Sequence, residues 1–315
     1  MSTLASTLLD RLRSTSLLQR IGLAAAAGLT LRLVSSYLSR RSFYARHEYS
    51  TVVITGASQG LGAATARVLA AALPRARIVL LARTKPLLDS LASELRVGGR
   101  AGAVEVHAVD CSQGAAMLAV AQCVGPTDIV IANAGAGTWR AIFEGDAHPA
   151  ETERCLAAPL ASALHTAHAF LPAMLAGAPR GSVFCVTQSP ASRLPWPGCT
   201  AYTAARWGLR GLCEALRADL PRGVAVCEVV LSEITDSAYF TTSNPGSKGR
   251  LPWIAPLFGS LTSQGAARAV LRALEGGAQE HVAPWQLSWG LSTLWIPGVA
   301  RVFAAAVRAT GWSHA

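Results

Sequence analysis

A glycine-rich turn carries the first recognisable chemistry in the chain. The run T-G-A-S-Q-G-L-G at residues 55–62 follows a short β-branched stretch and precedes an alanine-rich stretch typical of a helix. Gly56 allows a tight turn, Gly60 lets the backbone approach a phosphate, and Gly62 lets the helix pack closely on the strand. Exposed N–H groups at the helix start then face an anion, which predicts a pyrophosphate-binding turn. Its assigned residues are Gly56, Ser58, Gln59, Gly60, Leu61 and Gly62.

The end of the second predicted strand indicates which nucleotide binds there. An acidic residue at this place would bind a ribose 2′-hydroxyl and favour NAD, but Arg83 and Thr84 occupy it instead. A guanidinium offers a planar fork of donors to a 2′-phosphate, and the hydroxyls of Ser58 and Thr84 add further donors. The residues therefore predict NADP(H). The alternative is that Arg83 is a solvated surface arginine, in a chain where Lys85 and Lys248 are the only lysines among 28 basic residues.

Strands and helices alternate from residue 50 onward. Short apolar, β-branched runs predict strands at 51–55, 77–82, 103–109, 128–132, 182–187, 224–231 and 281–284. Helical patterns cover 63–73, 86–96, 202–220 and 151–175, the last interrupted by Pro159. This alternation with short loops predicts an α/β fold: a single Rossmann-like, doubly wound parallel sheet with helices on both faces.

Three segments are expected along the chain: a leader at 1–47, a domain at 48–284 and a C-terminal extension at 285–315. The leader carries +6 of the net charge of +10, but its apolar stretch at 21–31 is only 11 residues long. A bilayer span needs about 20. A weak membrane anchor, an interfacial amphipathic helix and an organelle transit peptide remain as alternatives, beside a disordered, removable leader.

The extension is rich in tryptophan, a side chain favoured where apolar surface meets water. Its tryptophans are Trp285, Trp289, Trp295 and Trp312. A membrane-docking surface, a helical wall over a hydrophobic substrate cleft, and packing onto the domain are the three interpretations.

Composition excludes several classes of protein. Hydrophobic residues make up 51% of the chain and charged residues 15%, which excludes a disordered body. The excess positive charge lies in the leader, so no nucleic-acid groove is expected. Seven cysteines without C-x-x-C spacing predict a reduced, intracellular environment with neither a metal site nor a disulfide framework.

Further motifs follow the predicted strands in a fixed order. Asp110 follows the third strand and an N-A-G turn at 133–135 the fourth; a serine lies 13 residues before the tyrosine of a Y-x-x-x-R run at 202–206. Over residues 48–240 the chain resembles the short-chain dehydrogenase/reductase family, including its membrane-associated, NADP(H)-dependent members. The residues carrying the resemblance beyond the glycine turn are Asp110, Asn133, Ala134, Gly135, Ser189, Tyr202 and Arg206.

The resemblance implies roles for these residues. Tyr202 would be the catalytic acid/base, Ser189 would hydrogen-bond the same substrate oxygen, and Arg206 would supply positive charge and ribose contacts. Positions 202 and 206 share one helix face, so a cation there stabilises a phenolate and lowers the phenol pKa. Asp110 would contact adenine, the 133–135 turn and Tyr202 would face the cofactor, and the loop at Ile234 would hold the nicotinamide amide.

Three positions depart from the family pattern. Arg206 stands where the family has lysine, and arginine makes a poor proton relay because it does not deprotonate. Pro159 stands where the family has a catalytic asparagine that positions a water molecule. Leu231 and Ser232 replace a Pro-Gly pair, and the following residues match only loosely.

Together these features predict an NADP(H)-dependent oxidoreductase that interconverts a ketone and a secondary alcohol on an apolar, lipid-like substrate. The alternative is a non-catalytic NADP(H)-binding protein, favoured by Pro159 and Arg206. Membrane association inside the cell, at the endoplasmic reticulum or another organelle, is expected from the leader and the tail. A homodimer or homotetramer is expected from the resemblance alone.

Overall fold

The computed structural model describes residues 17–98, 102–137, 149–177, 181–194, 196, 198–239 and 255–293, with isolated positions at 298, 299, 302 and 305. The chain divides into two compact units, one ending at Ala45 and the other beginning at Arg46. Residues 17–45 of helix α2 (Leu17–His47) make up the described part of the first unit, and the apolar residues of this helix do not gather on one face. Within the described residues, no helix is both long and apolar enough to cross a membrane. Attachment through residues 1–47 stays a prediction.

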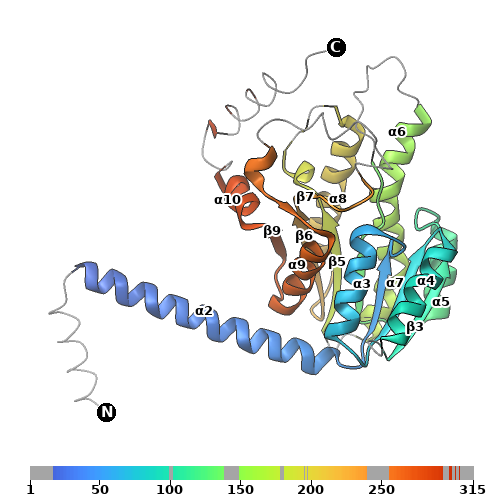
Figure 1. Ribbon diagram of the computed structural model, residues 1–315, viewed down its shortest axis with the longest axis horizontal. Coiled ribbons are helices and arrows are strands. Elements are labelled where there is room, and N and C mark those ends of the chain that lie inside the picture. Colours follow the sequence, from blue (N-terminus) through green and yellow to red (C-terminus); the bar gives the residue numbers. More distant parts are fainter. Residues whose placement is uncertain are drawn as a thin grey trace. The chain divides into compact units, whose positions relative to one another are not determined.

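Seven strands of the second unit form one parallel sheet (Figure 1). In spatial order they are β3 (Ala103–Ala108), β2 (Arg77–Ala82), β1 (Thr51–Thr55), β4 (Ile129–Ala132), β5 (Ser182–Gln188), β6 (Val224–Leu231) and β9 (Glu280–Ala283). Val53 of β1 pairs with Val79 on one side and Val130 on the other. All three are fully buried, as expected for strands covered on both faces.

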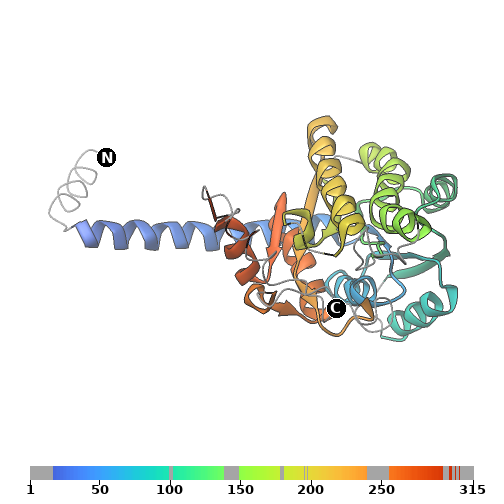
Figure 2. The ribbon, with the colours of Figure 1, turned by 90° about the horizontal axis from the view of Figure 1, so that it is seen from above.

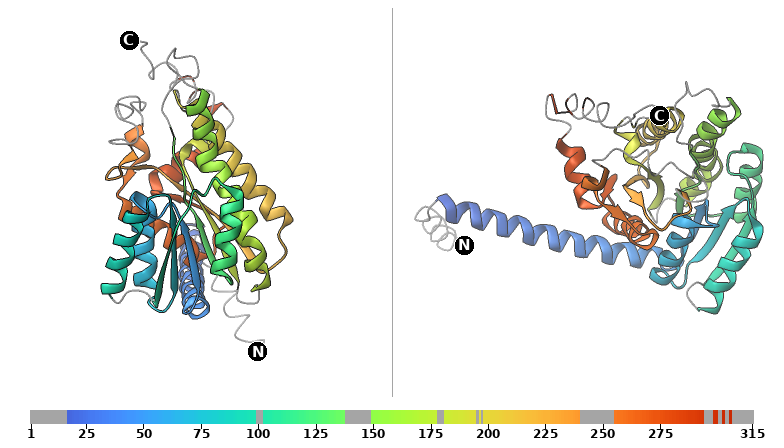
Figure 3. Two further views of the ribbon diagram at one scale, coloured as in Figure 1. Left: turned by 90° about the vertical axis from the view of Figure 1, so that its right-hand side faces the viewer. Right: turned by 45° about the horizontal axis from the view of Figure 1, so that its top comes forward.

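Helices cover both faces of this sheet, which confirms the predicted doubly wound fold (Figures 2 and 3). One face carries α3 (Gly60–Ala72), α4 (Lys85–Val97) and α9 (Ser263–Gly276); the other carries α5 (Gly114–Val124), α7 (Ser162–Ala176) and α8 (Thr200–Asp219). Helices α5 and α9 were not predicted. In α5, almost every residue is apolar, so no period stands out. The start of α9 is capped by the Thr262 hydroxyl, which accepts from Gly265 N–H at 3.1 Å.

Pro159 interrupts the long helix before β5, as predicted. The segment divides into α6 (Pro149–Leu156), a π-helical turn η1 (Ala157–Ala161) and α7. Proline lacks the N–H of the helical ladder and its ring clashes with the carbonyl one turn earlier, so the helix widens locally. The turn matters because it runs beside the site described below.

Small elements complete the end of the sheet where the strands terminate. They are η3 (Pro190–Ser192), η6 (Ala255–Phe258), α10 (Trp285–Thr293) and the two-stranded pair β7 (Glu233–Ile234) and β8 (Ser260–Leu261). Strand order reverses between β1 and β4, and this reversal opens a crevice at the carboxyl ends of the strands.

Candidate active site

A cavity of about 700 Å³ occupies that crevice. It is lined by segments that follow β1 through β6, brought together because parallel strands all end at the same edge. Every residue assigned from the sequence to cofactor or catalysis lines it. These are Gly56, Ser58, Gln59, Gly60, Leu61, Gly62, Arg83, Thr84, Asp110, Asn133, Ala134, Gly135, Ser189, Tyr202, Arg206 and Ile234.

The glycine turn needs its glycines for three separate reasons. Gly56 has φ +66°, and a Cβ there would lie 2.9 Å from Ala134 Cα. A Cβ on Gly62 would lie only 2.1 Å from the Gly56 carbonyl oxygen. Gly60 has φ +53° but opens toward free space, where only Ser237 Cβ comes within 3.9 Å of an added Cβ. The turn therefore leaves room for a ligand at Gly60 while packing tightly elsewhere.

Helix α3 begins at Gly60, and its N-cap Gln59 makes no side-chain capping bond. The first N–H groups of the helix thus face the cavity without a side-chain acceptor. A pyrophosphate is the type of group such a helix start holds. Two buried donors at the cavity, Arg206 Nε and Ser232 Oγ, also have no partner among the described residues. The donor set fits a dinucleotide phosphate and ribose.

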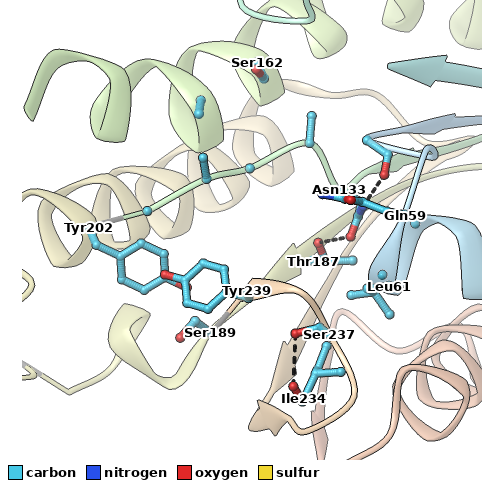
Figure 4. A pocket seen from close by; sticks show the side chains of 18 of the residues that line it. Gln59, Leu61, Asn133, Ser162, Thr187, Ser189, Tyr202, Ile234, Ser237 and Tyr239 are labelled. Atoms are coloured by element: carbon cyan, nitrogen blue, oxygen red, sulfur yellow. Dashed lines mark hydrogen bonds between the residues drawn. The ribbon is translucent and has the colours of Figure 1, made fainter. Parts of the chain in front are cut away.

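Asn133 ties the ends of three strands together (Figure 4). Its Nδ2 donates to the Thr55 carbonyl at 3.1 Å, and its Oδ1 accepts from Thr187 Oγ1 at 3.2 Å. The Thr55 hydroxyl in turn accepts from the N–H groups of Asn133 and Ala134, both at 2.9 Å. This network holds β1, β4 and β5 in register beneath the cavity, so Asn133 positions the site through contacts with the backbone of β1 and the Thr187 side chain of β5.

Arg83 and Asp110 place opposite charges at the far end of the cavity. Asp110 Oδ1 accepts from Ser112 Oγ at 2.7 Å and from Ser112 N–H at 2.9 Å. Partial burial of the carboxyl opposes ionisation, but these hydrogen bonds and the charge of Arg83 together lower the pKa of Asp110. Arg83 itself is exposed. The Asp110 carboxylate, held by hydrogen bonds, therefore lies near the exposed guanidinium of Arg83, in the part of the cavity next to the end of β2.

Tyr202 and Arg206 meet on one face of α8. Tyr202 is 7% exposed, and the guanidinium carbon of Arg206 lies 4.8 Å from the centre of its ring. Arg206 Nη1 donates to the Thr187 carbonyl at 3.1 Å, which holds the guanidinium over the ring. A permanent cation therefore lies over the face of the phenol ring, which attracts it.

Ser189 follows β5 on the same wall of the cavity. Its hydroxyl accepts from Ala191 N–H at 3.3 Å and caps the short helix η3. Figure 4 draws Ser189 with Tyr202, Tyr239, Asn133 and Leu61 among the side chains that line the pocket. A hydroxyl, a phenol and a guanidinium therefore line the same cavity as the glycine turn.

Comparison with known proteins identifies the family of this chain. A sequence model of the short chain dehydrogenase family matches residues 50–246. The chain belongs to this family. Bovine dehydrogenase/reductase SDR family member 7B is 31% identical over 228 residues, 70% of this chain and 67% of that protein. The 3-dehydrosphinganine reductase TSC10B of Arabidopsis thaliana is 29% identical over 61% of this chain and 57% of its own length.

Solved structures share the fold. The alcohol dehydrogenase of the archaeon Thermococcus sibiricus, complexed with 5-hydroxy-NADP, superposes with a TM-score of 0.62 at 27% identity, covering 74% of this chain and 95% of that one. Similar folds have been solved with NADP and with NAD, so the fold alone does not choose between the two. The family and fold expected from the motifs are thus confirmed.

The short-chain dehydrogenase pattern is broken at Pro159, and the structure shows what lies there. Pro159 is buried in the π-helical turn, while Ala157, Ala158 and Ser162 around it line the cavity. Ser162 is 3% exposed, and its carbonyl accepts from Thr166 Oγ1 at 2.6 Å. Beside Glu151 and Arg154 of α6, this helical segment therefore brings a serine to the cavity wall, one turn after the proline.

The loop after β6 departs from the family differently. Leu231, Ser232 and Ile234 line the cavity, but Asp236 turns to the start of α9. Its Oδ1 accepts from Ser263 N–H at 2.6 Å and Ser263 Oγ at 2.8 Å, and these bonds lower the pKa of Asp236. The loop is thus anchored to a helix outside the cavity.

Sequence reasoning missed several residues of this site. Tyr239 lies beside Tyr202, with ring centres 6.3 Å apart, and a Cβ on Gly137 would come within 2.4 Å of Tyr202 and 2.7 Å of the Tyr239 hydroxyl. Trp196, Phe258 and Cys155 also line the cavity. None has a local sequence signal, since each sits in a loop or on a helix that only the fold brings to the site.

Cys199 packs near Tyr202 as a buried thiol. Cys199 is fully buried, and burial raises the pKa of its thiol to about 12, which keeps it protonated. Among the described residues, no group of three or more His, Cys, Asp or Glu side chains is placed to hold a metal ion.

Proposed function

We propose that this protein is an NADP(H)-dependent oxidoreductase that interconverts a ketone and a secondary alcohol on an apolar, lipid-like substrate. Family membership makes it an oxidoreductase with a nicotinamide-nucleotide-binding fold. The observation that carries the proposal is the convergence of Tyr202, Ser189 and Arg206 on the cavity that also holds the glycine turn.

The chemistry of the three side chains follows from their contacts. When bound, the nicotinamide nucleotide supplies or accepts the hydride. Tyr202 donates the proton to the carbonyl oxygen in reduction and takes it from the hydroxyl in oxidation. Ser189 donates a hydrogen bond to the same oxygen and holds it in line. The Arg206 guanidinium, 4.8 Å from the ring centre, stabilises the phenolate left after proton transfer.

NADP(H) is preferred over NAD(H) because of the charge at the end of β2. Arg83 is exposed at the cavity edge, and Ser58 and Thr84 bring hydroxyl donors to the same place. No acidic residue directly follows β2 to bind a ribose 2′-hydroxyl. We expect Arg83→Ala to weaken NADPH binding far more than NADH binding in equilibrium titrations. Equal losses for both nucleotides would refute the assignment.

Activity with hydrophobic ketones tests the reaction itself. We expect purified protein to oxidise NADPH in the presence of at least one ketone of a hydrophobic panel, followed by nicotinamide absorbance. Tyr202→Phe should bind NADPH normally but abolish turnover, since it removes only the proton donor. If the wild-type protein binds NADPH tightly and turns over no ketone, the oxidoreductase reaction proposed here is wrong.

Pro159 and Arg206 support a second candidate, a non-catalytic NADP(H)-binding protein. Arg206 does not release a proton at ordinary pH, and its Nη1 is committed to the Thr187 carbonyl. Pro159 offers no side-chain donor or acceptor. This candidate predicts NADPH-dependent stabilisation in thermal unfolding without turnover, which is the outcome that separates it from the first.

Membrane association and assembly complete the proposal. We propose that residues 1–47 attach the protein to an intracellular membrane, on the strength of their apolar stretch and basic flanks. Deleting residues 1–46 should move the protein from the membrane to the soluble fraction; persistent membrane binding would shift the role to the Trp-rich extension. A homodimer or homotetramer is tested by light scattering of the purified protein.

A further inference from the structure

Two aromatic rings form one wall of the cavity next to the candidate catalytic residues. Trp196, in the loop after η3, and Phe258, the last residue of η6, both line the cavity. Their ring centres lie 6.3 Å apart at an interplanar angle of 87°, an edge-to-face arrangement. Both rings are only partly buried, so apolar surface remains open toward the cavity.

Trp196 connects this aromatic wall to Tyr202. It packs against the buried cluster of Cys155, Ala191, Cys199 and Tyr202, and Cys199 Sγ donates to its carbonyl at 3.3 Å. It also packs against a second buried cluster that includes Leu287 and Leu291 of α10. The aromatic wall therefore lies between the proton donor and the C-terminal helix.

Helix α10 holds Phe258 through a glycine contact. A Cβ on Gly290 would lie 2.6 Å from Phe258 Cε1 and 2.9 Å from Cδ1, so the ring lies directly against the helix backbone. Gly259, which follows Phe258 in the chain, has φ +68°, and a Cβ there would lie 2.9 Å from Pro284 Cγ. The chain around Phe258 is thus fixed on both sides by the segment that begins α10.

We propose that Trp196 and Phe258 are specificity-determining residues that receive the hydrocarbon part of the substrate, and that α10 positions them through Gly290. This inference rests on the proposed function. The substrate class is a ketone or secondary alcohol with an extended or ring-containing hydrocarbon beside the reacting carbon. A small polar ketone leaves this apolar surface in contact with water. Each methylene group of a longer substrate that is buried against the surface should raise kcat/KM about fourfold.

A series of 2-ketones of increasing chain length, with NADPH as reductant, tests the proposal. Wild-type kcat/KM should rise with chain length. Trp196→Ala and Phe258→Ala should flatten that rise, lowering kcat/KM for the longest ketone by roughly tenfold or more while changing the shortest little. Phe258→Leu, which keeps an apolar side chain, guards against a variant that does not fold and should give an intermediate slope.

The role of α10 has a matched pair of variants. Gly290→Ala should shift the Phe258 ring and reduce the preference for long ketones, because the added methyl overlaps the ring. Gly211→Ala, also within a helix but with nothing within 4 Å of an added Cβ, should keep the wild-type slope. Identical slopes for wild type, Phe258→Ala and Gly290→Ala would overturn the inference.

Calorimetric titration of a long-chain 2-alcohol, with NADP⁺ present, separates this inference from the proposed function. Binding that depends on Phe258 without any turnover would refute the reaction and support the aromatic wall. Turnover whose dependence on chain length is the same in wild type and in the Trp196 and Phe258 variants would support the reaction and refute the aromatic wall. Neither binding nor turnover of any long-chain compound would overturn both.

Discussion

Removing the charge of Arg206 is the sharpest test of the candidate active site. Arg206→Met keeps the length and much of the apolar stem of the side chain but takes away the cation that faces Tyr202. It also removes the Nη1 bond to the Thr187 carbonyl, which orients the guanidinium but does not touch the phenol. The variant should fold and lose rate, and its kcat is compared at saturating NADPH because Arg206 also belongs to the donor set expected to hold the nucleotide.

The size of the loss follows from the geometry. The guanidinium carbon lies 4.8 Å from the Tyr202 ring centre. At that separation two unit charges interact by about 3.5 kcal/mol when the effective dielectric constant is 20. Because the phenol bears only part of a unit charge in the transition state, we expect kcat to fall by roughly 100-fold. Arg206→Lys keeps a cation and should stay within about tenfold of wild type.

The assay is steady-state reduction of a ketone that the wild-type protein accepts, at saturating NADPH. Arg210→Met is the matched control, since Arg210 lies one turn later on α8 and does not line the cavity. It should leave kcat unchanged. If Arg206→Met kept the wild-type kcat while Tyr202→Phe abolished it, the reasoning that couples the guanidinium to the phenol would be refuted.

Three further predictions concern the glycine turn and the stability of the fold. Gly62→Ala should abolish NADPH binding and destabilise the protein in urea, because its Cβ would lie 2.1 Å from the Gly56 carbonyl, whereas Gly211→Ala should do neither; unchanged affinity would contradict the tight turn. Burial, reinforced by the charge of Arg46 and opposed by that of Asp128, lowers the pKa of His47 from 6.5 to about 4, so the unfolded chain takes up this proton first as pH falls. Stability should therefore be full above pH 6.5 and decline toward pH 4. His47→Gln should weaken that decline in unfolding titrations while exposed His168→Gln keeps it, and an identical decline in both would refute the role of His47. Arg193→Met removes the guanidinium 3.1 Å from the fully buried Glu228 carboxylate and leaves it only the more distant Arg217, at 4.0 Å. It should cost about 3 kcal/mol of unfolding free energy. Lys85→Met breaks an exposed pair and should cost less than about 1 kcal/mol, so equal losses would show that burial does not decide the difference.

Much of the site could be predicted from the sequence because its signals are local. The glycine turn is recognisable from neighbouring residues, since φ and close packing at Gly56 and Gly62 depend on the turn itself. Tyr202 and Arg206 share a helix face by spacing alone. Asp110 and Asn133 follow predicted strands, and the carboxyl ends of parallel strands meet at one edge. The position of each of these residues on the cavity wall can therefore be predicted without knowledge of long-range contacts.

Other features were decided by tertiary contacts that no local pattern encodes. Helix α5 was not predicted because apolar residues lie on all sides of it, which leaves no helical period to recognise. Its place on the sheet comes from packing against α7. Tyr239 meets Tyr202 only because Gly137 leaves room between them.

At the substrate end of the cavity, too, tertiary contacts decided what the local sequence could not predict. Trp196 and Phe258 lie 62 positions apart in the chain and become one wall only where α10 packs beneath them. The sequence alone determines the nucleotide-binding sheet and the residues at its strand ends. Short-range periodicity is enough for this, because it sets where strands end and which residues share a helix face. The shape of the pocket that meets the substrate came from loops and a C-terminal helix, whose paths depend on side chains far apart in the sequence.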